Sequence, residues 1–197
     1  MVDGAGAPIA EEDSGSVELL DGTSVPYHAI APENASALQR FHHRLSERSI
    51  YLRFFAAKPE LSDREAVYFT NLDKINRFAL VAVDPKRPEE IVGVVSFDRE
   101  GTTERAEYAA EVEDSWQGRG LGLALTRRLV EAALKRDVRT LTAFVLPQNR
   151  GMLHLLRDLG LPERLRYEDG TDYIEIDLSP PQDTSDRAAG ASGPQEG

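Results

Sequence analysis

The stretch DSWQGRGLGLAL, residues 114–125, decides the fold of this chain. It places three glycines, Gly118, Gly120 and Gly122, just before a Leu- and Ala-rich run that ends at Arg136. A glycine-rich turn that leads into a helix brings unpaired backbone N–H groups and the positive end of the helix dipole to one point, where an anion binds. The pattern therefore predicts an anion site at the turn and a helix over residues 121–136.

This turn lacks the residues that two common nucleotide-binding turns require. A P-loop ends in Gly-Lys-Ser/Thr, because the lysine reaches phosphate and the hydroxyl holds magnesium. Here Gly122 is followed by Leu123 and Ala124. The dinucleotide fingerprint G-x-G-x-x-G would need glycine at position 123 or 125, and both positions are leucine. It also belongs after the first strand of a βαβ unit, whereas this turn follows a third consecutive strand pattern. Both nucleotide interpretations are excluded.

Apolar periodicity predicts the elements around the turn. Three β-rich runs at 78–84, 91–98 and 105–112 precede it and are typical of an antiparallel meander. The apolar run TLTAFVL, 140–146, follows the helix, which predicts a parallel crossover. Further out, the patterns predict a strand pair at 16–20 and 25–30, helices at 31–45 and 62–72, a helix over 149–160, and a closing hairpin around Asp169-Gly170. The second of these helices begins with a capping box formed by Ser62 and Glu65.

Length and composition predict one folded domain. Of the 197 residues, segments 1–15 and 179–197 are rich in Gly, Ser, Pro, Ala and acid, so we expect disordered tails there and a domain over 16–178. The net charge of −11 argues against nucleic-acid and membrane-surface partners. The chain has no cysteine and no apolar run of about 20 residues, so we expect a cytoplasmic protein without thiol chemistry.

The turn and its context resemble a known family. DSWQGRGLGLAL matches the Q/R-x-x-G-x-G/A motif of the GNAT family of N-acetyltransferases through Gln117, Gly120 and Gly122. A downstream helix that begins near Asn149 matches as well. The resemblance covers 16–178 and implies the GNAT fold, an α/β domain of the α+β type. Its central mixed, mostly antiparallel sheet is flanked by helices, and its fourth and fifth strands splay apart.

The resemblance implies acetyl-CoA as co-substrate and places its binding residues. The backbone from Gln117 to Leu123 would ring the pyrophosphate, with Arg119 adding positive charge. The pantetheine arm would pair with Ala110 and Val112 on the family's fourth strand, here RAEYAAEV, 105–112. The cofactor-binding set expected from the resemblance is Ala110, Val112, Gln117, Gly118, Arg119, Gly120, Leu121, Gly122, Leu123 and Asn149.

A narrower resemblance concerns residues 45–65, LSERSIYLRFFAAKPELSDRE. This segment is similar to one in bacterial protein lysine acetyltransferases that modify acyl-CoA synthetases. Those enzymes use a glutamate within an A-E-hydrophobic pattern as general base, which implies Glu107 here. Strand alternation predicts that Glu107, Glu111 and Glu113 share one face, with Glu111 as the backup base. Arg53 lies between aromatics and is a candidate to bind substrate or to lock the loop.

One position departs from the family pattern. Many members carry a tyrosine seven residues after the helix asparagine, where it protonates the leaving thiolate, and here that position is Leu156. The general acid is therefore unassigned, with water, Tyr51, Tyr108 and Tyr173 as alternatives. No metal is expected, because the histidines have no ligand spacing; the neighbours His42 and His43 point about 100° apart on a helix.

Three functions follow as hypotheses. The first is direct transfer of acetyl from acetyl-CoA to the lysine ε-amine of a protein, with an acyl-CoA synthetase as candidate partner. The second is N-acetylation of a small-molecule amine. A narrow, closed acceptor pocket would favour this second function, whereas an open acidic groove would favour a protein lysine. The third, from another class, is a non-catalytic acyl-CoA-binding sensor; the loss of the family tyrosine at Leu156 favours it and the presence of Glu107 opposes it.

Overall fold

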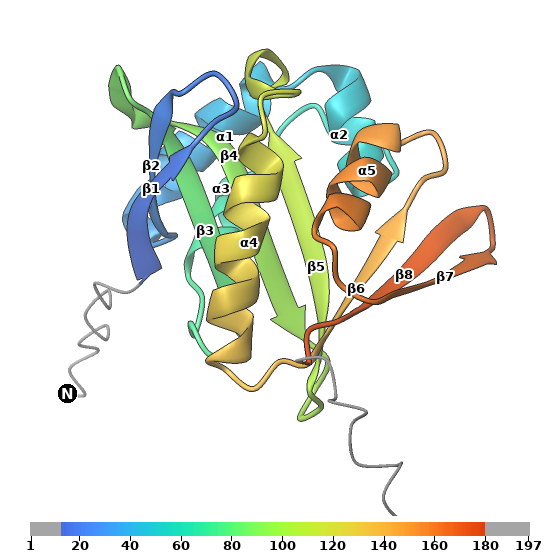
Figure 1. The fold of residues 1–197 in the computed structure, drawn as a ribbon. Helices are drawn as coiled ribbons and strands as arrows, with labels where there is room; N and C mark the ends of the chain where they lie inside the picture. Colours follow the sequence, from blue (N-terminus) through green and yellow to red (C-terminus); the bar gives the residue numbers. More distant parts are fainter. Residues whose placement is uncertain (1–12, 180–197) are drawn as a thin grey trace, which may run out of the picture.

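A computed structural model describes residues 13–179, which form an eight-stranded sheet with helices on both faces (Figure 1). The spatial order of the strands is β1-β2-β3-β4-β5-β6-β8-β7. The strands are β1 Ser14–Glu18, β2 Ser24–Ala29, β3 Arg77–Asp84, β4 Arg87–Arg99, β5 Arg105–Val112, β6 Thr140–Val145, β7 Glu163–Glu168 and β8 Thr171–Asp177. The α-helices are α1 Ala35–Arg44, α2 Glu47–Phe54, α3 Asp63–Thr70, α4 Leu121–Leu134 and α5 Arg150–Asp158.

The strand pairing confirms the predicted topology, an α+β sheet that is mixed and mostly antiparallel. β3, β4 and β5 form the antiparallel meander, and β5 pairs with β6 in parallel across the α4 crossover. The closing hairpin is also confirmed, since Asp169 and Gly170 both have positive φ, 47° and 83°.

The sheet opens between β5 and β6, the strands that the family counts as its fourth and fifth. Only three residue pairs join them, Arg105 with Thr140, Ala106 with Leu141 and Glu107 with Thr142. β4 pairs with β5 all the way to Val112, so the second half of β5 has a partner on one side only. Figure 1 shows the two strands diverging from this short contact.

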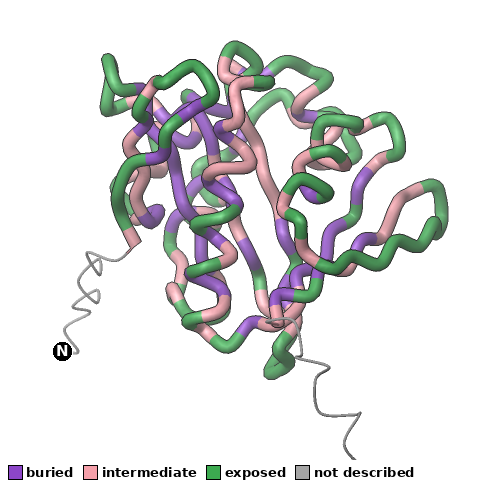
Figure 2. Tube along the Cα trace, viewed as in Figure 1, coloured by how far each residue is buried: buried purple, intermediate pink, exposed green. Residues whose placement is uncertain are grey.

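The apolar core is divided by the sheet. On β3, Phe78 and Leu80 pack into a cluster beneath α4, whereas Ala79 and Val81 pack into a second cluster with α1, α2 and α3. Both faces of β3 are buried, and Figure 2 shows this buried centre in contrast to the exposed β7 strand. The centre of the sheet is thus buried on both faces, and β5, two strands away from β3, borders the opening toward β6.

One helix was missed in the sequence. The sequence patterns predict no element over 46–61, but Glu47–Phe54 forms α2, capped by the Ser46 hydroxyl, which accepts a hydrogen bond from the Ser49 N–H at 3.2 Å. The capping box of α3 is confirmed, because the hydroxyl of Ser62 and the carboxylate of Glu65 each accept from the other's backbone N–H.

The predicted boundaries shift by a few residues. β1 begins at Ser14, so Ser14 and Gly15, which composition assigns to a tail, are paired with β2. α4 ends at Leu134 rather than at Arg136. Residues 1–12 and 180–197 of the predicted tails lie outside the described residues. Within residues 13–179, no helix is long and apolar enough to cross a membrane.

Candidate active site

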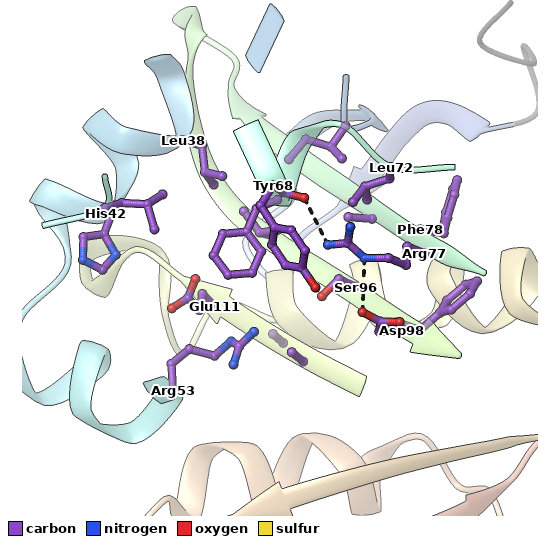
Figure 3. Close-up of a pocket in the computed structure, with 18 of the residues that line it drawn as sticks. Leu38, His42, Arg53, Tyr68, Leu72, Arg77, Phe78, Ser96, Asp98 and Glu111 are labelled. Carbon is purple, nitrogen blue, oxygen red and sulfur yellow. Dashed lines mark hydrogen bonds and ion pairs between the residues drawn. The ribbon is translucent and has the colours of Figure 1, made fainter. Parts of the chain in front are cut away.

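Two cavities meet at β5. A cleft of about 470 Å³ runs between β5, β6, α2, α5 and the glycine turn. A smaller cavity of about 220 Å³ lies between the same part of β5, β4 and the helices α1 and α3 (Figure 3). Six residues line both spaces and form what we call the junction: Arg53, Phe54, Glu107, Ala109, Ala110 and Glu111.

The glycine turn exposes backbone at one end of the cleft. Gly118 and Gly120 have φ of +69° and +88°, values that glycine adopts without steric cost, and Gly120 is the N-cap of α4. At Gly122 a Cβ would lie 2.8 Å from Leu155 Cδ1, so any larger residue would require the end of the Leu155 side chain to move. Of the predicted cofactor set, Gln117, Gly118 and Gly122 line the cleft here.

The free edge of β5 forms one wall of the cleft. The Glu113 N–H donates to Val92 of β4 at 2.9 Å, and antiparallel pairing alternates in direction from residue to residue. The backbone groups of Ala110 and Val112 therefore face the opening toward β6, as the resemblance implied. Gln117 Nε2 donates to the Val112 carbonyl at 2.9 Å, which ties the glycine turn to this edge.

The side chain of Arg119 lies elsewhere than expected. Its guanidinium donates to Asp21 at 2.8 Å and to Thr23 at 3.2 Å and lies 4.5 Å from the centre of the Trp116 ring. Arg119 does not line the cleft, and its charge is matched by Asp21, whose pKa falls to about 2 chiefly through hydrogen bonds from Thr23. The arginine fastens the glycine turn to the β1–β2 hairpin.

The remaining predicted cofactor residues have structural roles as well. Leu121 is buried in the core beneath α4, so only its backbone can serve a ligand. Neither Gly120 nor Leu123 lines the cleft, and Gly120 is close to Leu20 instead. Asn149 lines the cleft and caps α5, because its Oδ1 accepts from the Met152 N–H at 3.1 Å.

Glu107 and Glu111 both lie at the junction but in different surroundings. Glu107 is exposed, at the point where β5 parts from β6. Glu111 Oε1 is buried and has no hydrogen-bond partner within residues 13–179. Burial raises the pKa of the Glu111 carboxyl, and the positive charge of Arg53 opposes that rise. The two candidate bases predicted from the sequence therefore differ in burial: the carboxylate of Glu107 is exposed and that of Glu111 is buried.

Glu113, the third glutamate of this face, does not take part in the site. Its carboxylate accepts from Arg44 Nε at 2.8 Å, and Arg44 also pairs with Glu90 at 2.5 Å. This network ties the end of α1 to the end of β5. Glu113 therefore fixes the end of β5, the strand that carries Glu111.

Helix α2 brings Arg53 and Phe54 to the junction. Its first turn is held by Asp114, which accepts from the hydroxyls of Ser46 and Ser49 at 2.6 and 2.9 Å. Gln117 Nε2 also reaches Ser49 Oγ at 3.2 Å. These positioning contacts were missed from the sequence, where only the D-S-W-Q run before the glycines was a signal of them.

The smaller cavity combines an apolar interior with one ion pair. Arg77 donates to Asp98 at 3.1 Å and to the Tyr68 carbonyl at 3.0 Å, and its guanidinium lies 3.9 Å from the centre of the Tyr68 ring. Figure 3 shows these three residues on one side of the cavity, with Glu111 and Arg53 facing it from the other. An amine that entered here would meet carboxylates at the junction.

The tyrosine alternatives for a general acid are reduced by the geometry. Tyr108 lines the cleft, but its buried hydroxyl lies 2.7 Å from Thr126 Oγ1, and burial raises its pKa well above the usual range. The Tyr173 hydroxyl accepts a hydrogen bond from the Arg105 guanidinium, and Tyr51 does not line the cleft. Leu156, at the family tyrosine position, is buried in the core. Within the described residues, these positions present no free phenol to the cleft.

Of the histidines, His42 of α1 lines the smaller cavity (Figure 3). His42 Nε2 lies 2.7 Å from the Lys58 carbonyl, close to the edge of the Phe54 ring. Among residues 13–179, no cluster of three or more His, Cys, Asp or Glu side chains has the arrangement to hold a metal ion.

Comparison with known proteins gives consistent matches. The sequence profile described as Acetyltransferase (GNAT) family matches residues 40–161. The GNAT domain of PAT from S. lividans superposes with a TM-score of 0.80 at 32% identity, over 85% of this chain and 98% of that one. Acetyltransferase PA5475 of Pseudomonas aeruginosa is 26% identical over 83% of this chain and 89% of its own length. The fold of yncA from Salmonella typhimurium, solved with its cofactor acetyl-CoA, matches with a TM-score of 0.62 at 16% identity, over 80% and 96% of the two chains.

Proposed function

The chain belongs to the GNAT family of acetyltransferases, and we propose that it transfers acetyl from acetyl-CoA to the lysine ε-amine of a protein. The observation that carries this proposal is the junction, where a cleft suited to a long donor and a cavity suited to an amine meet at two glutamates. The similarity to the S. lividans PAT domain supports a protein acceptor.

The residues present fit the co-substrate of the family. Backbone N–H groups at the start of α4 would hold the pyrophosphate, and the free edge of β5 at Ala110 and Val112 would pair with the pantetheine arm. A backbone N–H on this edge would also stabilise negative charge on the thioester oxygen. When bound, acetyl-CoA supplies an activated acetyl group and a thiolate that leaves readily, since a thiol pKa is about 8.5.

A carboxylate must remove a proton from the acceptor. A lysine amine has a pKa near 10.4 and arrives protonated, so it becomes nucleophilic only after it gives up a proton. We assign this step to Glu107, whose carboxylate lies at the junction and is open to solvent, so that the proton can pass on to water. The amine nitrogen then forms the bond to the acetyl carbon, the carbon–sulfur bond breaks, and the second proton of the nitrogen passes to the departing thiolate, directly or through water. Glu111 is the alternative base.

A small-molecule amine is the second candidate acceptor. The observation that favours it is the smaller cavity itself, whose 220 Å³ are enclosed by side chains such as Phe41, Phe69 and Leu72. A lysine chain needs only a narrow passage, whereas an aromatic amine would use this apolar volume. A protein partner such as an acyl-CoA synthetase and a panel of small amines are therefore the two sets of acceptors to compare.

One experiment tests the proposal. The protein is incubated with acetyl-CoA and either a lysine-exposing acyl-CoA synthetase or small amines, and both thiol release and product mass are measured. Acetylated lysine on the synthetase supports a protein acceptor, and an acetylated amine alone supports the second candidate. Coenzyme A binding by calorimetry without any acylated product would leave only the binding-sensor function. A Glu107→Gln variant serves as the inactive control.

A further inference from the structure

The face of the sheet that carries Glu107 continues beyond the active site. Glu107 pairs with Thr142 of β6, Thr142 with Glu175 of β8, and Glu175 with Arg164 of β7. Directly paired residues point to the same side of a sheet, so these four side chains form one row on the face that also holds the smaller cavity. Three strand spacings of about 4.8 Å place Arg164 about 14 Å from Glu107.

The next row on this face is aromatic and basic. Phe144 pairs with Tyr173, and Tyr173 with Arg166. The two rings lie 5.0 Å apart, and Phe144 is 50% exposed although it also lines the cleft. Tyr173 itself is partly buried, and an aromatic pair with one exposed ring next to arginines is the composition that protein–protein contact sites favour. We call Phe144, Arg164, Arg166 and Tyr173 the β7 face.

The charges of the β7 face are available to a ligand. Glu175 is matched by Arg105 at 2.6 Å, and this contact is the main cause of its lowered pKa. Arg164 and Arg166 make no hydrogen bond or salt bridge within the described part of the chain. Both side chains are exposed. The acids on the same side are Glu168, at the hairpin end of β7, and Glu175 and Asp177 on β8, and the positive charge of Arg164 contributes to the lowered pKa of both β8 carboxyls. In a chain of net charge −11, the four residues of the β7 face carry two positive charges that no salt bridge within the described residues takes up.

We propose that the β7 face binds an acidic segment of the protein acceptor, so that the lysine to be acetylated enters beside Glu107. This proposal rests on the protein-lysine function given above and specifies the acceptor. An extended chain rises about 3.3 Å per residue, so the separation of 14 Å corresponds to about four residues. Preferred acceptors carry Asp or Glu about four or five positions from the target lysine, and the acidic remainder of the enzyme surface repels competing acidic segments.

Synthetic peptides test this directly. The capped peptides Lys-Gly-Ser-Gly-Glu-Glu and Glu-Glu-Gly-Ser-Gly-Lys cover both chain directions, and the same peptides with Gln for Glu are the neutral partners. We expect wild-type kcat/KM to favour at least one acidic peptide by about tenfold, since two exposed ion pairs together give an effect of this order. The preference should fall toward one in high salt, because exposed pairs are screened.

Charge reversal distinguishes an effect of the β7 face on peptide preference from an effect of the net charge of the enzyme. In Arg164→Glu/Arg166→Glu the acidic preference should vanish or invert while kcat/KM for the neutral peptide is retained. The matched control Lys86→Glu/Arg157→Glu makes the same change of net charge at exposed sites on the β3–β4 turn and on α5, and should keep the preference. A wild type without preference, or a preference that survives reversal at the β7 face, overturns the proposal. If no lysine peptide or protein is acetylated while small amines are, the protein-lysine function itself fails and the proposal falls with it.

Discussion

Asp114 and Ser46 join the two sides of the active site. Asp114 Oδ2 accepts from the Ser46 N–H at 2.9 Å, and its Oδ1 accepts from the Ser46 hydroxyl at 2.6 Å. Asp114 opens the turn that leads to the glycines, and Ser46 caps the helix that carries Arg53. A contact across 68 residues of sequence therefore sets the distance between the anion site and the acceptor side.

Asp114→Asn tests this connection. The amide keeps one acceptor oxygen but loses the second and the charge, so α2 should loosen. We expect kcat/KM for the amine acceptor to fall about tenfold, while the Kd of coenzyme A changes less than threefold. Loss of about 1 kcal/mol of capping should lower Tm by about 2–4 °C. Asp137→Asn, an exposed position with φ of +58° that asparagine tolerates, is the control. An equal loss in both variants would contradict the assignment.

Glu107→Gln tests the general base. Without the carboxylate the amine keeps its proton, and we expect kcat to fall by about 10²–10⁴-fold, the usual contribution of a general base. The defect should shrink as pH approaches the lysine pKa of about 10.4, because the free amine then needs no base. Stopped-flow thiol release measures the rate, and Glu104→Gln in the preceding turn is the control. A wild-type rate and pH profile would transfer the role to Glu111.

Glu111→Gln tests the buried carboxylate through stability. Burial raises the pKa of Glu111 in the folded protein, so the folded state holds this proton more tightly than the unfolded state does. Folding is therefore destabilised as pH rises from the ordinary value of 4.5 through the folded-state pKa, and no penalty exists below that window. The variant should have the higher Tm at pH 7.5 and match wild type near pH 4, as measured by calorimetry. A constant Tm difference across pH would contradict the raised pKa.

Gly122→Ala separates packing in the cleft from stability. The new methyl would lie 2.8 Å from Leu155 Cδ1, the flexible end of a side chain that also lines the cleft. Leu155 should turn into the cleft, which weakens coenzyme A binding about tenfold at a cost in stability below about 1 kcal/mol. Gly118→Ala should lower stability more than Gly122→Ala does, because a φ of +69° strains alanine by about 1–2 kcal/mol. A Cβ at this position would have open space around it and contact no neighbour. Calorimetric Kd and Tm values measure both.

Arg119→Ala tests whether this arginine binds the co-substrate. The guanidinium is held by Asp21 and Trp116, so we expect Kd for coenzyme A to change less than twofold. Loosening of the β1–β2 hairpin should lower Tm by a few degrees. A tenfold loss of coenzyme A affinity with unchanged Tm would return Arg119 to the pyrophosphate site that the sequence motif implied.

The outcome shows which features local sequence carries. The meander, the crossover and the Ser62 capping box follow from short-range patterns, and the structure confirms them. The eight-residue helix α2 was missed, whereas α3 of the same length was not, because Ser46 lacks the capping-box glutamate that follows Ser62. Asp114, far along the chain, holds the first turn of α2 instead. The partner of Arg119 is likewise 98 residues away. Residue types indicated where an anion can bind, whereas long-range partners decide which side chains are free to bind it.

The short contact between β5 and β6 has a consequence for the shape of the ligand. The cleft is a gap in a sheet, because β5 and β6 pair over only three residues and then diverge. Such a gap admits a slender, unbranched chain that offers hydrogen-bonding groups along its length, and a bulky ring would have to force the strands apart. Selection for a thin linear arm is therefore built into the backbone spacing of the sheet, before any side chain contributes to recognition.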